Sequence, residues 1–271
     1  TRMIASEILR FYAAGKEERR LAASIGRLEF IRTWEILERC MPESPCRVID
    51  IGGGTGVYAL RLASRDHKVH LVDAVPLHVE RAGALSSGLS GPLEAIHLGD
   101  ARRLPAPDSA FDVALLFGPL YHLTARADRV SALAEAKRVL VPGGLLLSAY
   151  ISRFASACDG IQEGALRDRA FAAIVDGDLT SGIHQNSTGR LEWFTTAYFH
   201  RPEEIQSEIE EAGLRFDALL AVEGPGWMNQ DLDAWLDDDD ARERLLAVLR
   251  RVEREPSLMG ASAHLIAVAR A

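Results

Sequence analysis

Hydrophobic and polar positions follow two alternating patterns over residues 47–150. Short runs rich in valine, isoleucine and leucine are separated by longer stretches in which apolar residues recur every three or four positions. The short runs predict buried β-strands, and the longer stretches predict helices that pack on them. This alternation is typical of an α/β domain with a doubly wound parallel sheet. Strands are expected at residues 48–51, 69–73 and 111–117, within 139–148, and at a run that ends near 98–101.

Two amphipathic helices are predicted within residues 1–46, before the first strand. Apolar side chains share one helical face in each of them, and two prolines end the second helix after residue 40. These helices could form a layer packed on the sheet. They could instead form a lid that brings Tyr12, Arg20 or Glu29 to a ligand. The pattern alone leaves both arrangements open.

The pattern after residue 150 departs from that of a minimal α/β domain. Residues 151–200 carry glycines between short helical pieces, which indicates an inserted cap. Residues 201–271 return to alternation, with a helix to residue 211, a sixth strand at 214–222, an acidic helix start at 237–240 and a seventh strand at 264–269. The expected organisation is an N-terminal helical lid (1–46), a core (47–150), a cap (151–200) and a C-terminal part of the core sheet (201–271).

The stretch from Val48 to Leu60 predicts a ligand site. It reads as a strand, a turn with four glycines in five positions, and the start of a helix. The first N–H groups of a helix lack partners within it, so they can bind a nucleotide-like ligand. Residues 54–59 also fit the dinucleotide pattern G-x-G-x-x-A, with Asp73 about 20 residues further on. Taken alone, the loop does not distinguish these cofactors.

The arrangement Asp50-x-Gly52-x-Gly54-x-Gly56 resembles motif I of the class I S-adenosylmethionine-dependent methyltransferases. The ends of the second and third strands, the fourth strand, and the turn and fifth strand resemble the same family in order and spacing over roughly residues 47–150. The resemblance implies a Rossmann-like, seven-stranded, mostly parallel sheet with strand order 3-2-1-4-5-7-6. It also implies that the seventh strand is antiparallel.

The resemblance implies roles for individual residues at the strand ends. Asp50 would lie beside the methionine part of S-adenosylmethionine, Asp73 would accept hydrogen bonds from the ribose hydroxyls, and Asp100 would meet the adenine amino group. A carboxylate suits a ribose diol because charge strengthens the hydrogen bonds. Each aspartate could instead be a simple turn or cap residue. The full set expected to bind the cofactor is Asp50, Gly52, Gly54, Gly56, Asp73, Ala74, Asp100, Ala101, Phe117 and Tyr12.

The methyl acceptor is expected beside the loop that follows the fourth strand. This loop lacks the N/D-P-P-Y/F form of many base and protein methyltransferases, which favours a small-molecule acceptor. Its Tyr121 and His122, with His184 of the predicted cap, are the candidate catalytic residues, since histidine can accept a proton near neutral pH. They could equally be capping or core residues. Aromatic side chains expected to bind an acceptor are Tyr150, Trp193, Tyr198 and Trp227.

Composition limits the classes of partner. The 271 residues carry a formal net charge of −8, which argues against nucleic acid because phosphate binding uses clustered lysine and arginine. No apolar stretch approaches a signal sequence or a membrane span, so we expect a cytoplasmic protein without membrane contact. The three cysteines show no metal-ligand spacing, so no metal is expected.

The expected function is methyl transfer from S-adenosylmethionine, with S-adenosylhomocysteine as product, to a small organic molecule, with a role in secondary metabolism. A peptide or protein side-chain methyltransferase is one alternative. A catalytically silent subunit that binds the cofactor is another. The sequence does not distinguish a monomer from a homodimer, nor an oxygen, nitrogen, carbon or sulfur acceptor.

Overall fold

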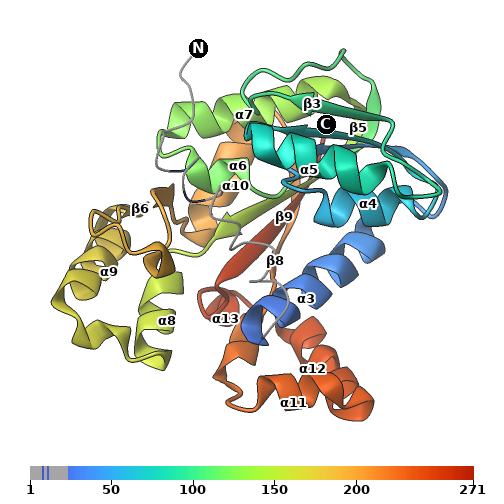
Figure 1. Cartoon of the computed structure of the whole chain (residues 1–271). Coiled ribbons are helices and arrows are strands. Elements are labelled where there is room, and N and C mark those ends of the chain that lie inside the picture. The colour runs from blue at the N-terminus through green and yellow to red at the C-terminus, as the bar shows by residue number, and fades with distance from the viewer. Residues whose placement is uncertain (1–7, 9–10, 12–23) are drawn as a thin grey trace.

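A seven-stranded sheet forms the centre of the computed structural model, which describes residues 8, 11 and 24–271 (Figure 1). The strand order is β3-β2-β1-β4-β5-β9-β8. Neighbours from β3 to β5 run parallel, whereas β9 is antiparallel to both β5 and β8. The predicted strand order and the antiparallel seventh strand, which is β9, are therefore confirmed. The strands are β1 (Arg47–Ile51), β2 (Lys68–Asp73), β3 (Ala95–Leu98), β4 (Phe111–Leu116), β5 (Leu140–Ile151), β8 (Arg215–Ala221) and β9 (His264–Arg270).

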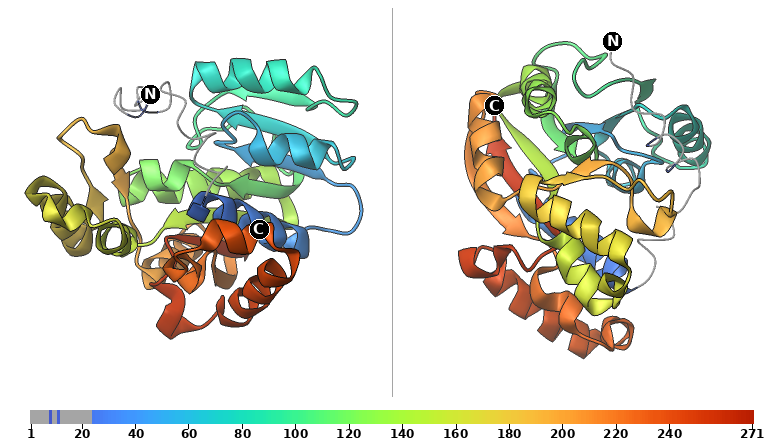
Figure 2. Two further views of the ribbon diagram at one scale, coloured as in Figure 1. Left: turned by 60° about the horizontal axis from the view of Figure 1, so that its bottom comes forward. Right: turned by 90° about the vertical axis from the view of Figure 1, so that its left-hand side faces the viewer.

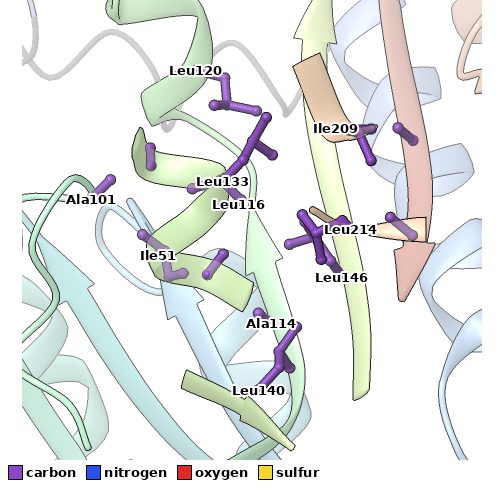
Figure 3. Packing of buried hydrophobic residues seen from close by; sticks show 14 of the residues in the cluster. Ile51, Ala101, Ala114, Leu116, Leu120, Leu133, Leu140, Leu146, Ile209 and Leu214 are labelled. Atoms are coloured by element: carbon purple, nitrogen blue, oxygen red, sulfur yellow. The ribbon is translucent and has the colours of Figure 1, made fainter. Parts of the chain in front are cut away.

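Helices cover both faces of this sheet, as the runs of buried strand residues predicted. Ala114 and Leu116 of β4 pack with Leu133 of α7 and Ile209 of α10 in one core (Figure 3). The intervening Leu115 belongs to a second core on the opposite face, built with α3, α4 and α5. The helices of these layers are α3 (Ser24–Cys40), α4 (Val57–Ala63), α5 (Pro76–Ser86), α6 (Pro119–His122), α7 (Arg126–Val139) and α10 (Pro202–Glu211).

Residues 152–201, between β5 and α10, form a separate group of short elements. Its helices α8 and α9 lie to one side of the sheet, away from α4 and α5 (Figures 1 and 2). Its final segment returns to the sheet, where Ala197 and Phe199 pack against Ile151 and Tyr121. The elements are α8 (Ala155–Gln162), η1 (Ala165–Arg167), α9 (Arg169–Ser181), β6 (Ile183–His184), η2 (Leu191–Trp193) and β7 (Ala197–Tyr198).

A helical group between β8 and β9 packs beside α3 (Figure 2). Leu28 of α3 is buried with Leu236 and Leu249 of this group. Asp238 accepts a hydrogen bond from the Ala241 N–H at 2.7 Å, so the predicted acidic helix start is confirmed as a helix cap. The elements are η3 (Gly224–Met228), α11 (Leu232–Asp237), α12 (Asp239–Val252) and α13 (Pro256–Met259).

A buried ion pair joins α7 to α10. The guanidinium of Arg129 donates to Glu208 at 2.6 Å, and the two side chains are 2% and 0% exposed. The Nε2 of His200 contacts the other Glu208 oxygen at 3.4 Å. Burial alone would raise the pKa of Glu208, but the hydrogen bonds and charges of His200 and Arg129 outweigh it and lower that pKa to about 2. Glu208 is therefore ionised over the physiological range.

Candidate functional site

A cavity of about 390 Å³ lies at the carboxyl ends of the parallel strands. Its wall includes Gly52 after β1, Asp73 at the end of β2, Asp100 after β3 and Phe117 after β4. Ligands of open α/β sheets bind at this edge, where the strand order reverses between β1 and β4. The cavity therefore lies where the sequence placed the ligand.

The glycine loop after β1 brings backbone directly to the cavity wall. Gly52 has φ +74°, and a Cβ added to it would lie 2.4 Å from the Pro119 side chain. Any larger residue would therefore be both strained and in collision with the loop after β4. The Gly54 N–H donates to Asp73 at 2.9 Å, which ties this loop to the end of β2. The loop then opens α4, whose first N–H groups face the same edge of the sheet.

Asp50 at the end of β1 is a buried acid that lines the cavity. It is 1% exposed, and among the described residues neither carboxylate oxygen has a hydrogen-bond partner. Burial is the main cause that raises the pKa of Asp50 to about 7, and the nearby charge of Asp73 adds to it. The Ala59 amide opposes this shift, although it does not form a hydrogen bond of ordinary geometry with the carboxylate. A buried carboxylate without donors is costly. A cationic ligand group that donates hydrogen bonds would remove this cost.

Asp73 combines a structural role with a position on the cavity wall. Its carboxylate accepts from the Val75 N–H at 2.8 Å and from Gly54, and it contacts the His78 ring at 3.2 Å. These contacts leave acceptor capacity, because an ionised carboxylate offers about four lone-pair sites. Asp73 is 7% exposed, so a ligand hydroxyl that reached it would be largely shielded from water. The turn role and the ligand role therefore coexist.

Asp100 is held in place by its neighbour Arg102. The guanidinium donates to both carboxylate oxygens, at 2.6 and 3.0 Å, and the Arg102 N–H adds a third bond at 2.9 Å. Burial opposes ionisation, but these bonds outweigh it and hold the pKa of Asp100 below its usual value. Ala101 and Ala74 line the same part of the wall. Asp100 is thus a fixed anionic acceptor.

Another part of the cavity wall is formed by α6 and the end of the insertion. Tyr121 and His122 both line the cavity, with ring centroids 4.8 Å apart. The Nδ1 of His122 donates to the Thr196 carbonyl at 3.3 Å, and Thr196 itself lines the cavity. Phe194 packs 5.8 Å from the His122 ring. Residues 194–196 therefore hold α6 against the cavity.

Comparison with known proteins agrees with this geometry. Residues 48–144 match the family model described as a methyltransferase domain. They form a class I S-adenosylmethionine-dependent methyltransferase domain. The cofactor of this domain is S-adenosylmethionine, so the dinucleotide interpretation of the glycine loop is set aside. The predicted family, fold and cofactor are confirmed.

Two curated relatives of the methyltransferase domain have names from quinone biosynthesis. Demethylmenaquinone methyltransferase of Deinococcus radiodurans is 42% identical over 112 residues, which cover 40% of this chain and 44% of that protein. The ubiquinone/menaquinone biosynthesis C-methyltransferase UbiE of Hahella chejuensis is 34% identical over 175 residues, or 62% of this chain and 66% of that protein. The chain thus spans about half the length of the first relative and about two thirds of the second.

Solved structures share the fold over nearly the whole chain. A Thermotoga maritima S-adenosylmethionine-dependent methyltransferase, described as a possible histamine N-methyltransferase, has a TM-score of 0.57 at 18% identity and covers 97% of this chain and 98% of its own. The [4+2]-cyclase SpnF has a TM-score of 0.56 at 23% identity, with 92% and 83% covered. At these sequence identities the likeness shows a shared fold and no more.

The residues of the methyltransferase domain fit its cofactor. The carboxylate of Asp50 would receive the ammonium group of the methionine part, which supplies the donors that it lacks. Asp73 would accept the ribose hydroxyls, and Asp100 with Ala101 would face the adenine. These three acids lie along one continuous wall. Gly56 is the one glycine of the motif that does not line the cavity. It precedes the first residue of α4 and has a φ of +94°.

Several residues predicted to meet the acceptor do not line the cavity. His184 is 2% exposed and is fixed between the Asp178 carboxylate at 2.9 Å and the Trp193 carbonyl at 2.8 Å. Tyr150 is fully buried in the core beside α7. The Trp227 ring donates to the Ala261 carbonyl at 2.6 Å. Tyr198 stacks under Arg129, its ring centroid 3.7 Å from the guanidinium carbon, and Trp193 packs on Phe171.

Other cavity residues did not emerge from the sequence. His78 and Arg81 of α5 line the cavity on the side of Asp73 and Asp100, which we call the adenosine acids. Val222 and His264 line the side away from these two acids. Glu29 of α3 reaches the same wall, as the lid interpretation had allowed. The predicted contact of Tyr12 lies outside the described residues. Among the described helices, none has the length and apolar composition needed to cross a bilayer.

Proposed function

We propose that the chain is an S-adenosylmethionine-dependent methyltransferase that acts on a small organic acceptor. The observation that carries this proposal is one cavity whose wall includes Asp100, His122, Thr196 and the buried carboxylate of Asp50, which has no hydrogen-bond partner among the described residues. The lining of the cavity extends beyond Asp50, Asp73 and Asp100 to Tyr121, His122 and Thr196. Its volume of about 390 Å³ suits small ligands. The role in secondary metabolism stays a prediction.

The chain's own residues supply position and charge. Bound S-adenosylmethionine supplies an electrophilic methyl group on a positively charged sulfur. Asp50 would hold the methionine part of that molecule, and Asp73 would hold its ribose. Tyr121 and His122, which also line the cavity, then orient the acceptor. Holding two reactants in line in this way removes much of the entropic barrier to their reaction.

The names of the relatives favour a hydroxylated aromatic acceptor over a peptide. Both are named for quinone biosynthesis, and one is named a C-methyltransferase. Tyr121, His122 and Ile266 all line the cavity and would offer aromatic and apolar surface to a hydroquinone ring. We therefore place a hydroquinone first among the acceptors to be tested, with a catechol, histamine and a mixed peptide library after it.

Calorimetry and a release assay test the proposal. S-Adenosylhomocysteine should bind with a micromolar dissociation constant, about −8 kcal/mol, and NAD should give no comparable response. Incubation with S-adenosylmethionine and each acceptor should release S-adenosylhomocysteine, and mass spectrometry should show a product heavier by one methyl group. Binding without release on any acceptor would support a silent cofactor-binding subunit. Release of S-adenosylhomocysteine with peptides alone would instead support a methyltransferase for peptide or protein side chains.

A further inference from the structure

A histidine and a buried glutamate form a pair on the far wall of the cavity. His264 is the first residue of β9, and Glu223 follows β8. Because β9 is antiparallel to β5, its first residue lies beside Ile151 at the carboxyl end of β5. The reversed strand therefore brings a residue from late in the chain to the edge where the cofactor binds.

The hydrogen bonds fix the imidazole in one orientation. The Nδ1 of His264 donates to Glu223 at 2.5 Å. The other Glu223 oxygen accepts from the His264 N–H at 3.0 Å and from the Ser262 hydroxyl at 2.9 Å. Burial would raise the pKa of Glu223, but the charge and hydrogen bonds of His264 outweigh it and lower that pKa. An ionised, fully buried carboxylate thus holds Nδ1 as the protonated nitrogen.

The pair lies on the acceptor side of the cavity. In the sheet order, the adenosine acids follow β2 and β3, whereas β5 and β9 lie on the other side of β1 and β4. Ala149 of β5 and Ile266 of β9 line the cavity next to His264. A methyl group held above β1 and β4 would therefore lie between the cofactor acids and this histidine. None of the contacts that fit the cofactor uses it.

We propose that His264, positioned by Glu223, is the catalytic base that takes the proton of a hydroxyl-bearing acceptor. The proposal rests on the methyltransferase function proposed above. The acceptor oxygen, or a ring carbon that it activates, forms the bond to the methyl carbon while the carbon–sulfur bond breaks and its electron pair stays on sulfur. The hydroxyl proton passes to Nε2 of His264. Sulfur loses its positive charge as the imidazole gains one.

One further acid contacts the same imidazole. The Glu29 carboxylate on α3 lies 3.6 Å from Nδ1. Two carboxylates, those of Glu29 and Glu223, thus lie beside the His264 imidazole in the described part of the chain, and both favour its protonated form. Because Nδ1 carries the proton that it donates to Glu223, this nitrogen is not open as a metal ligand, and the group is arranged for proton transfer.

Nitrogen NMR of the full chain tests the geometry without an acceptor. Protein labelled with ¹⁵N-histidine and saturated with S-adenosylhomocysteine should show a His264 signal, identified by its loss in His264→Gln. In its neutral form this histidine should carry its proton on Nδ1, leaving Nε2 as the acceptor nitrogen. A neutral form protonated on Nε2 would overturn the proposal. So would a shift of this signal on addition of Mg²⁺ or Mn²⁺.

Turnover tests the role itself, with whichever hydroxylated acceptor from the panel is methylated. His264→Gln should lower kcat by about 100-fold or more, the range for general bases, with affinity for S-adenosylhomocysteine changed less than about twofold. Glu223→Gln should lower kcat less and move the acid limb of the pH–rate profile to lower pH, because a charge that stabilises the imidazolium is lost. Unchanged kcat and pH profile in His264→Gln would refute the base.

His70→Gln is the matched control. His70 of β2 also contacts a glutamate, Glu94 at 3.4 Å, but it does not line the cavity. This variant should keep the wild-type kcat and pH profile. If the wild-type chain fails to bind S-adenosylhomocysteine, the proposed function fails. If the wild-type chain binds S-adenosylhomocysteine and methylates an acceptor, and His264→Gln is equally active, only the role of His264 as the base is contradicted.

Discussion

Replacing Asp50 by asparagine should make the ligand-free protein more stable and the cofactor complex weaker. The change keeps the shape of the side chain and removes its charge. In the folded chain the pKa of Asp50 is about 7, well above the value near 3.8 of an unperturbed aspartate. Folding therefore takes up a proton at this site. At neutral pH the ionised carboxylate costs stability, and its neutral isostere does not.

The sign and size of this stability change follow from the linkage between protonation and folding. A raised acid pKa gives a penalty that is fully present above the folded value near 7 and disappears below the unfolded value near 4. The penalty is about 4 kcal/mol at pH 8 and between roughly 1 and 2 kcal/mol at pH 5. Any pH-independent cost of the buried amide cancels in the comparison. The gain from Asp50→Asn should therefore be larger at pH 8 than at pH 5 by about 2–3 kcal/mol.

Urea unfolding of wild type and Asp50→Asn at the two pH values measures this difference, since a stability change appears in the midpoint at constant slope. Calorimetry of the same samples should show affinity for S-adenosylhomocysteine lower by about 1.5–3 kcal/mol, the range for hydrogen bonds to charged groups. A variant whose stability relative to wild type is the same at both pH values would refute the assigned pKa. Unchanged affinity would refute the ammonium contact.

Three further predictions concern other parts of the site and the fold. Asp73→Ala should weaken S-adenosylhomocysteine binding by about 1.5–3 kcal/mol in calorimetry; unchanged affinity would make Asp73 a turn residue only. His122→Ala should lower turnover and leave that affinity within about 0.5 kcal/mol, whereas His184→Ala should mainly lower the melting temperature because its ring is fixed inside the insertion. Glu208→Gln should cost about 3–5 kcal/mol of unfolding free energy at pH 7, because it leaves Arg129 buried without its partner. The difference from wild type should shrink as the pH falls from about 4.5 to 2, where wild type loses the stability that the ionised Glu208 contributes.

The sheet could be predicted because each of its strands carries a local signal. Buried runs such as Leu115 and its neighbours in β4 need cover on both faces, and the acids at the strand ends then meet at one edge by topology. Asp50, Asp73 and Asp100 were recognised because the strand ends resemble those of the methyltransferase family. Their places depend on the strand order, which the same resemblance implied.

The acceptor wall could not be predicted to the same depth, because it depends on how distant segments fold back. The residue types of His184 and Trp193 suited either an acceptor site or a core of the insertion, and in the structure they pack within the insertion against Asp178 and Phe171. His264 was assigned only to a strand. Its place at the cavity could have been inferred, since an antiparallel seventh strand must begin where the parallel strands end.

The position of β9 between β5 and β8 determines how the chain can be divided. The family match ends at residue 144, but β5 is hydrogen-bonded to β9 from Leu145 to Ile151. A recombinant fragment that stopped after β5 would expose one edge of a strand whose Leu146 and Leu147 are fully buried in the intact chain. Such an edge is a template for intermolecular strand pairing. Expression of residues 47–151 alone should therefore yield aggregates.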